Sequence, residues 1–557
     1  MKELHKGVTF KKAHPLDEVV PGRWPEAAGY PGHGYQRFVD QGMVIERDVE
    51  VVLRDGIKIY IDLYRPDTNE PVPVLLSWNP YGKHSPQDMS KLPGTGVDCS
   101  KLSKYTTWEA PDPVWWSANG YALILPDPRG IFHSEGDATF WNHAEAEDEY
   151  DLIEWAGTQE WSNGKVGLAG VSYLAVSQWL VASHKPPHLA AINPWEGFSD
   201  IYREVCFHGG IPETGFVPWW QEGVEFGLSH VEDLPRTCAA HPLLDEHWQS
   251  KMTDFSKITV PAYVVASWSD QGLHTRGTLE AYKGLGSTDK WLEIHGRKKW
   301  GYYYQDDSLQ RQLTFFDTYL KEKSTNIDSW PKVRYEIRDS SYVGDVHEAT
   351  QWPLPGTSYE RLYLEASNGR LNTEPADEES EVGYDCESLE QDLAQFDFTF
   401  EQTTTLVGHA KLHLFIEADG ADDADLFVSL EKIDKNGAQV DFPFFSIRDN
   451  GPVALGWLRV SHRDLDPKLS TEHQPWHTHE REVPIRPGEI VPAEIEIWPS
   501  GTRFEAGETL RLVISSSDRR KFPYMPFNRH AINRNRGRHV IHTGGQYDSY
   551  LLVPVAN

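Results

Sequence analysis

One serine in this 557-residue chain stands where a nucleophile could be activated. Residues 167–175 read Gly-Leu-Ala-Gly-Val-Ser-Tyr-Leu-Ala, a short apolar run that breaks at Gly170 and resumes as a helical pattern from Tyr173. A serine on such a strand-to-helix turn is held outward in a strained conformation, and small neighbours allow the turn to close. The alternative is an ordinary helix N-cap serine. The context favours Ser172 as the nucleophile of an acyl-transfer reaction.

A nucleophilic serine needs a base, and the base needs an orienting carboxylate; after this kind of turn the chain order is serine, acid, histidine. Asp270 follows the strand-like run 262–266, and His295 follows the run 290–294. Catalytic groups of parallel sheets collect at such strand ends. His274 is a competing base, but it shares one loop with Asp270. We therefore predict that His274 is poorly placed to bridge Asp270 and Ser172, and we favour His295.

Two donors are predicted for the oxyanion that forms when the serine attacks. The helix that begins at Tyr173 directs its first amide N–H groups toward the site. The apolar run 72–78 ends just before Tyr81, which places a tyrosine hydroxyl at the same edge of the predicted sheet. The residues alone support equally a tyrosine that merely finishes a turn.

The elements that must position these residues follow from two hydrophobic patterns. Up to about residue 320, short buried runs at 72–78, 121–125, 165–169 and 262–266 alternate with helical patterns such as 144–159, which indicates a mostly parallel sheet covered by helices. From about residue 331, runs such as 411–416 and 425–430 alternate apolar and polar residues between turn signals, which is typical of antiparallel strands in a sandwich. The run 333–337 is assigned to that sandwich.

Composition narrows the class of protein. The chain carries 53 Lys and Arg against 84 Asp and Glu, a formal charge of −31, which argues against nucleic acid or an anionic membrane as a partner. Its four cysteines form no CxxC pair, so we predict neither a disulfide scaffold nor a metal site. Without a signal-like segment or a long apolar stretch, the chain is predicted to be soluble and cytoplasmic. A homo-oligomer is compatible with the sequence.

Several motifs together resemble one superfamily, the serine hydrolases that include cocaine esterase and X-prolyl dipeptidyl peptidase. They are Asn-Pro-Tyr-Gly-Lys at 79–83, Asp-Pro-Arg-Gly at 127–130, Gly-Val-Ser-Tyr-Leu at 170–174 and Gly-Gln-Tyr-Asp-Ser-Tyr-Leu-Leu-Val-Pro at 545–554. The resemblance spans nearly the whole chain. It implies the α/β class: an α/β-hydrolase domain in two parts, 1–194 and 256–329, a helical cap inserted at 195–255, and an all-β jelly-roll domain at 330–557.

Carried over residue by residue, the resemblance implies that Ser172 is the nucleophile and Asp270 the triad acid, and that the Tyr81 hydroxyl and the Tyr173 N–H form the oxyanion hole. The family's histidine usually stands in a Gly-Pro-Trp-x-His stretch. Here residues 295–300 read His-Gly-Arg-Lys-Lys-Trp, and an ungapped alignment puts Lys299 at the histidine position. Pairing of serine with lysine is known chemistry, so Lys299 is the alternative base to His295.

The leading hypothesis is a serine hydrolase that cleaves a small-molecule ester or amide through an acyl-enzyme, with no metal or cofactor. Sixteen of the 21 tryptophans precede residue 320, so part of this aromatic content is expected to line a pocket for a bulky apolar acyl group. The pocket residues proposed are Trp195, Trp219, Trp220, Trp268 and Trp300. The alternatives are an X-prolyl dipeptidyl peptidase, for which Glu196 and Glu213 could bind the substrate ammonium, an acyltransferase, or a degenerate non-catalytic binding protein.

Overall fold

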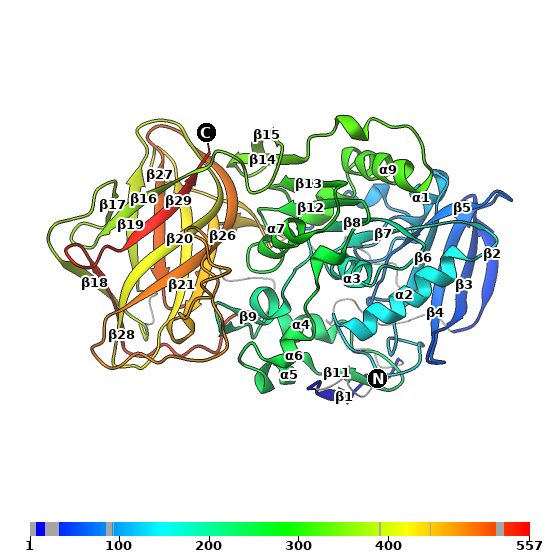
Figure 1. Cartoon of the computed structure of the whole chain (residues 1–557), viewed down its shortest axis with the longest axis horizontal. Helices are drawn as coiled ribbons and strands as arrows, with labels where there is room; N and C mark the ends of the chain where they lie inside the picture. Colours follow the sequence, from blue (N-terminus) through cyan, green and yellow to red (C-terminus); the bar gives the residue numbers. More distant parts are fainter. Residues whose placement is uncertain are drawn as a thin grey trace.

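The computed structural model describes residues 7–16, 33–84, 92, 94–388, 392–445, 447–519 and 529–556. Two bodies lie side by side: an α/β body from the first part of the chain and a strand-rich body from the last (Figure 1). Within the described ranges, no helix is long and apolar enough to cross a membrane.

The α/β body is built on one long mixed sheet in which β5, β6, β7, β8, β12, β13 and β14 run parallel. The central strands are buried from end to end, as expected for a sheet covered on both faces. Their bounds are β5 (Val72–Leu76), β6 (Ala122–Asp127), β7 (Ser162–Val171), β8 (Leu189–Trp195), β12 (Ala262–Ser267), β13 (Lys290–His295) and β14 (Val333–Ser340).

Antiparallel strands continue this sheet at both ends. On one side, β4 (Lys58–Pro66) pairs with β6, and β3 (Met43–Val52) and β2 (Gln36–Asp40) follow. On the other side, β14 pairs in parallel with β13 and antiparallel with β15 (Val343–Ala349). The assignment of run 333–337 to the sandwich is therefore corrected, because β14 meets β26 at only one pair and mainly extends the α/β sheet.

Five helices pack against this sheet: α1 (Pro113–Ala118), α2 (His143–Gly157), α3 (Tyr173–Ala182), α7 (Thr275–Gly284) and α9 (Asp306–Leu320). Every residue of α3 is buried, which fits a helix enclosed between β7, β8 and α2. Trp116 of α1 packs edge-on against Phe316 of α9 at 5.7 Å between ring centroids. The α/β class predicted from the alternating patterns agrees with this architecture.

The segment between β8 and β12 combines short helices with short strands. It holds a π-helical turn (Tyr202–Cys206), the hairpin of β9 (Phe207–His208) and β10 (Ile211–Pro212), α4 (Phe216–Glu222), β11 (His230–Glu232), α5 (Leu234–Ala240) and α6 (Glu246–Gln249). β11 pairs with β1 (Phe10–Lys12), so the beginning of the described chain is tied to this insertion. Figure 1 places these elements beside the junction of the two bodies.

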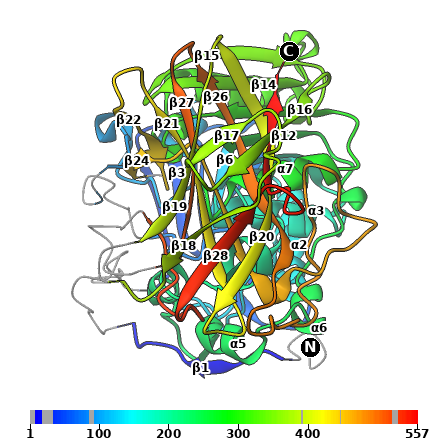
Figure 2. The ribbon, with the colours of Figure 1, turned by 90° about the vertical axis from the view of Figure 1, so that its left-hand side faces the viewer.

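The strand-rich body encloses its own hydrophobic core. One row of antiparallel strands is β16–β29–β20–β26, and a second is β25–β21–β27–β19 (Figure 2). Their bounds are β16 (Ser358–Glu365), β19 (Leu393–Thr399), β20 (Thr404–Asp419), β21 (Asp425–Ile433), β25 (Ala454–Arg459), β26 (Val491–Phe504), β27 (Thr509–Ser515) and β29 (Tyr550–Val555). Alternating residues of β20 supply Leu412, Leu414 and Ile416 to that core, as its sequence pattern predicts.

Candidate active site

Ser172 stands on a sharp turn between β7 and α3. Its backbone adopts φ 62° and ψ −114°, a conformation that non-glycine residues rarely take. The turn closes because Gly170 has no side chain: a Cβ there would lie 2.5 Å from Cβ of Leu174. The Ser172 N–H donates to the Trp195 carbonyl at 2.9 Å, which fixes the turn to β8. The sequence prediction of a strained serine elbow agrees with this geometry.

The histidine that contacts Ser172 is His274. Its Nε2 lies 3.2 Å from the Ser172 Oγ, and its Nδ1 bonds to Oδ2 of Asp270. The loop after β12 coils into one helical turn, in which the N–H groups of Leu273 and His274 both donate to the Asp270 carbonyl. Side chains four residues apart on such a turn point the same way. Asp270 and His274 can therefore act together on the serine.

His295 does not reach the serine, so its predicted role as base is wrong in this structure. Its Nε2 lies 3.0 Å from Oε1 of Glu196, and its ring stacks on Tyr302 with 4.0 Å between centroids. His295 and Glu196 are each about 1 % exposed. His295 is the last residue of β13, and it is held in a buried contact with the Glu196 carboxyl group.

Lys299, the alternative base, lies next to the acid and the histidine rather than next to the serine. Its Nζ donates to Oδ2 of Asp270 at 2.8 Å and lies 3.1 Å from Nδ1 of His274. The carboxylates around it, Asp270 first and then Glu196 and Glu109, outweigh the effect of burial and raise the pKa of Lys299. A protonated amine cannot accept the serine proton, so this geometry does not support Lys299 as the base.

The ionisation of the acid and the histidine follows from these contacts. Burial opposes the charge on Asp270, but Lys299 and His274 overcome it and hold the pKa of Asp270 below its ordinary value. Burial first, and then the charge of Lys299, lower the pKa of His274 to about 4, while Asp270 acts in the opposite direction. At neutral pH the site therefore holds a carboxylate, a neutral imidazole and an ammonium.

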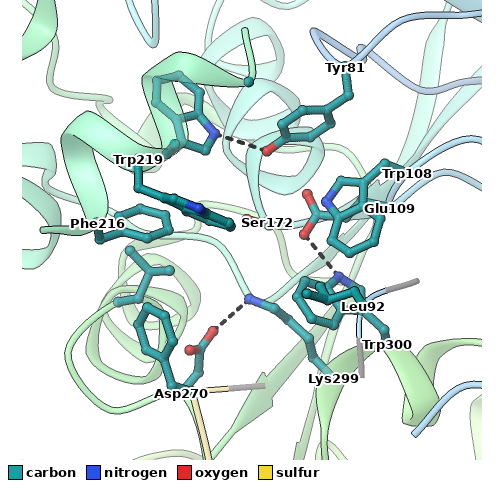
Figure 3. A pocket seen from close by; sticks show the side chains of 14 residues that line it. Tyr81, Leu92, Trp108, Glu109, Ser172, Phe216, Trp219, Asp270, Lys299 and Trp300 are labelled. Carbon is teal, nitrogen blue, oxygen red and sulfur yellow. Dashed lines mark hydrogen bonds and ion pairs between the residues drawn. The ribbon is translucent and has the colours of Figure 1, made fainter. Parts of the chain in front are cut away.

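The two predicted oxyanion donors come from different elements, the loop after β5 and the start of α3. Tyr173 begins α3, so its N–H has no acceptor within the helix. Its own hydroxyl is used elsewhere, in a bond to Glu145. Tyr81 lines the same cavity as Ser172, and its hydroxyl oxygen accepts from the Trp220 indole at 3.1 Å (Figure 3). That bond orients the Tyr81 hydroxyl, and the neighbouring Glu109 carboxyl is an acceptor for the Tyr81 proton when no substrate is bound.

A cavity of about 620 Å³ opens beside Ser172. Of the five predicted pocket tryptophans, Trp219, Trp220 and Trp300 line it. The other two do not, and these predictions are corrected. Trp195 is fully buried and packs edge-on against Tyr303, and the Trp268 indole donates to the Glu336 carbonyl at 2.7 Å. Both stand at the ends of strands and belong to the core.

The sequence reasoning missed several residues of the cavity wall. Trp108 and Glu109 come from the segment before α1, and Phe445 comes from the strand-rich body. The Glu109 carboxylate accepts from the Trp300 indole at 3.0 Å (Figure 3). Burial raises the pKa of Glu109 to about 8. Its φ of 64° and the bond from the Val171 N–H to its carbonyl hold it beside the elbow, and no local sequence pattern identified it.

The strand-rich body also holds the loop that carries Asp270 and His274. The Phe445 N–H donates to the Ser269 carbonyl at 2.8 Å. The Gln271 amide donates to the Pro499 carbonyl at 3.0 Å and accepts from the Leu455 N–H at 3.2 Å. The two side-chain bonds of Gln271 join residues 228 and 184 positions apart in the chain. They fix the turn that brings His274 to the serine.

Two family models match the chain. The model of the X-Pro dipeptidyl-peptidase (S15 family) covers residues 55–237, which include the serine elbow. The model of the X-Pro dipeptidyl-peptidase C-terminal non-catalytic domain covers residues 325–552. The first match covers part of the α/β body, and the second covers the strand-rich body together with β14 and β15. Each match covers less than half of the chain.

Similar proteins extend the match over nearly the full length. A solved structure of a CocE/NonD family hydrolase from Staphylococcus aureus is 41 % identical with a TM-score of 0.91, covering 98 % of this chain and 100 % of that one. Cocaine esterase from Rhodococcus sp. strain MB1 Bresler is 25 % identical over 93 % of this chain and 100 % of its own length. A putative Xaa-Pro dipeptidyl-peptidase from Bacillus anthracis is 20 % identical over 88 % and 85 %.

Proposed function

Because this chain belongs to the CocE/NonD family of hydrolases, we propose that it is a serine hydrolase that cleaves an ester or amide with a bulky apolar acyl group. One observation carries the proposal. A serine at positive φ lies 3.2 Å from His274 Nε2, and the same histidine bonds to Asp270 through Nδ1. This relation of nucleophile, base and orienting acid defines the catalytic triad.

The proposed reaction proceeds in two steps. The Ser172 oxygen attacks the acyl carbonyl while its proton passes to Nε2 of His274, and the developing oxyanion is bound by the Tyr81 hydroxyl and the Tyr173 N–H. The C–O or C–N bond then breaks, and the leaving group takes the proton from His274. In the second step water attacks the acyl-enzyme, gives its proton to His274, and releases the acid and the free serine.

The substrate class is proposed from the cavity wall. Trp108, Trp219, Trp300, Phe216 and Phe445 surround the space in front of the serine. Aromatic walls favour an apolar acyl group, because they gain free energy by covering apolar surface and offer few hydrogen bonds. The Glu109 carboxyl is the ionisable group of the wall nearest Tyr81 in Figure 3.

An X-prolyl dipeptidyl peptidase is the second candidate, and the carboxylates first considered for it have other partners. Glu196 is paired with His295, and Glu213 accepts from the N–H groups that begin α4 and binds Arg529 at 3.3 Å. Glu109 does line the cavity and could face a substrate ammonium. With its pKa raised to about 8, however, it is mostly neutral at pH 7, which favours the ester or simple amide.

A fluorophosphonate probe tests the nucleophile. We expect a covalent adduct on Ser172, located by mass spectrometry, and no adduct in Ser172→Ala. Folded wild-type protein without an adduct on Ser172 would refute the proposal and favour a non-catalytic binding protein. A substrate panel then tests the class: we expect p-nitrophenyl esters with aromatic acyl groups to be cleaved faster than Gly-Pro p-nitroanilide. The reverse order would favour the peptidase.

A further inference from the structure

The side chain of Lys299 occupies an unusual place for a lysine. It is about 3 % exposed, lies at the start of α8 (Lys299–Tyr303) and lines the cavity that contains Ser172. Its Nζ donates to Oδ2 of Asp270, the same oxygen that accepts the His274 N–H. Among the described residues, the other carboxylate oxygen, Oδ1, is buried without a hydrogen-bond partner. Two donors therefore share one oxygen of the acid. Figure 3 shows the bond from Lys299.

We propose that Lys299 is a positioning residue of the hydrolase: by binding the oxygen that orients His274, it fixes the acid and sets how strongly the histidine holds a proton. This inference rests on the serine hydrolase function proposed above. Lys299 does not touch the reacting atoms; it acts through Asp270 and His274.

The effect of this contact on the histidine follows from charge. When His274 takes the serine proton, the imidazolium stands 3.1 Å from the Lys299 ammonium, and the two cations compete for one carboxylate oxygen. Like charges at such a distance disfavour each other. The imidazolium is therefore less stable than in a triad without a lysine. His274 stays neutral, and able to accept a proton, at a more acidic pH than an ordinary histidine.

Other charged groups near Lys299 and His274 also affect the protonation of these two side chains. Arg529, reaching from the strand-rich body, also lowers the pKa of His274, and its own partner is Glu213. Asp270 and Glu196 lie near Lys299 and help to keep it protonated, and Glu196 also contacts His295. Within the described ranges, neither Arg529 nor Glu196 hydrogen-bonds to His274, whereas Lys299 contacts both His274 and its acid.

The test uses the rate of fluorophosphonate labelling of Ser172 as a function of pH, which needs no knowledge of the natural substrate. In this reaction the serine O–H bond breaks, a P–O bond forms, fluoride leaves and the proton passes to His274. With the pKa of His274 at about 4, the wild-type rate should change little between pH 8 and pH 5. An acid limb near the ordinary histidine value, about 6.5, would overturn the proposal.

Neutral variants give the second readout. In Lys299→Met and Lys299→Gln we expect the acid limb to move upward by one to two pH units, on the order of the shift that one nearby charge produces. The ratio of the rates at pH 5 and pH 8 should fall by about twofold for a shift of one unit and by about tenfold for a shift of two units, while Lys299→Arg should keep most of the wild-type ratio. A merely structural lysine would change the amount of folded protein and leave this ratio unchanged.

Lys411→Met is the matched control, because Lys411 is also buried and paired with a carboxylate, Glu494 at 3.1 Å, in the strand-rich body. Its pH ratio should equal that of the wild type. If both neutral variants keep the wild-type ratio, the proposal for Lys299 is wrong although Ser172 is still labelled. If the wild type is not labelled at any pH, the proposed hydrolase function itself fails. Should neither neutral variant fold, the wild-type acid limb decides.

Discussion

Two loops of the α/β body each carry a histidine, and the two histidines have different contacts. The loop after β12 carries Asp270 and His274, and the loop after β13 begins at His295 and reaches Lys299. Both leave the same edge of a parallel sheet. In the first loop the histidine meets the serine, and in the second it is buried against Glu196 while the lysine meets the acid. Position at a strand end is thus insufficient to identify a catalytic base; the course of the loop decides.

The largest expected effect contrasts the two histidines directly. His274→Ala should lower kcat/KM for an activated aryl ester by roughly 10⁴-fold or more, because the serine loses its base. His295→Ala should change kcat/KM of the folded protein by less than about tenfold. Within the described ranges, the His295 ring contacts Glu196 and Tyr302 rather than Ser172 or Asp270. Initial rates at pH 7.5 measure both. A greater loss in His295→Ala would reverse the assignment of the two loops.

The two tyrosines proposed for the oxyanion hole offer a second comparison. Tyr81 lies on the loop after β5, and Tyr173 begins α3. Tyr81→Phe should lower kcat by about 10²-fold, because it removes a donor that acts on the transition state. Tyr173→Phe should cost less than about tenfold, because Tyr173 is proposed to act through its backbone N–H and its hydroxyl bonds to Glu145. Equal losses in the two variants would argue against the Tyr81 hydroxyl as a donor.

For the loop after β13, we expect substitution of the histidine to affect the free energy of unfolding more than the catalytic rate. His295→Ala should lower the free energy of unfolding by roughly 3 kcal/mol, because it leaves the buried Glu196 carboxylate without its partner. His274→Ala should lower it less, because Asp270 keeps its bond to Lys299. Urea unfolding followed by tryptophan fluorescence measures both values. A smaller loss in His295→Ala than in His274→Ala would contradict the comparison.

The smallest expected effect separates wall tryptophans from core tryptophans. Trp219→Ala should raise KM for an aromatic acyl ester by about tenfold and change KM for the acetyl ester much less, because only the larger group reaches the wall. Trp195→Ala should instead lower the free energy of unfolding by about 3 kcal/mol or more. If Trp219→Ala affects both esters equally, the cavity is not the acyl pocket.

The pattern of the sequence was sufficient where local chemistry dictates the structure. The buried runs at 121–125, 165–169 and 262–266 became β6, β7 and β12, because short apolar segments bounded by turn residues have few other stable arrangements. Gly170 and Ser172 formed the elbow for the same reason, since only a residue without a side chain permits that turn. The run 333–337 was misplaced, because alternation does not tell which sheet a strand will join.

By itself, the sequence was enough to propose Ser172 as nucleophile and Asp270 as acid and to predict the α/β class. Only the tertiary structure showed which histidine contacts the serine, because the Asp270–His274 turn is held by Phe445, Leu455 and Pro499 of the strand-rich body. The tertiary structure was also needed to assign Trp195 and Trp268 to the core, because a tryptophan is equally suited to a core and to a pocket wall. Contacts between residues far apart in the chain determine which histidine reaches Ser172 and which tryptophans line the cavity. Such contacts cannot be predicted from the local spacing of residues in the sequence.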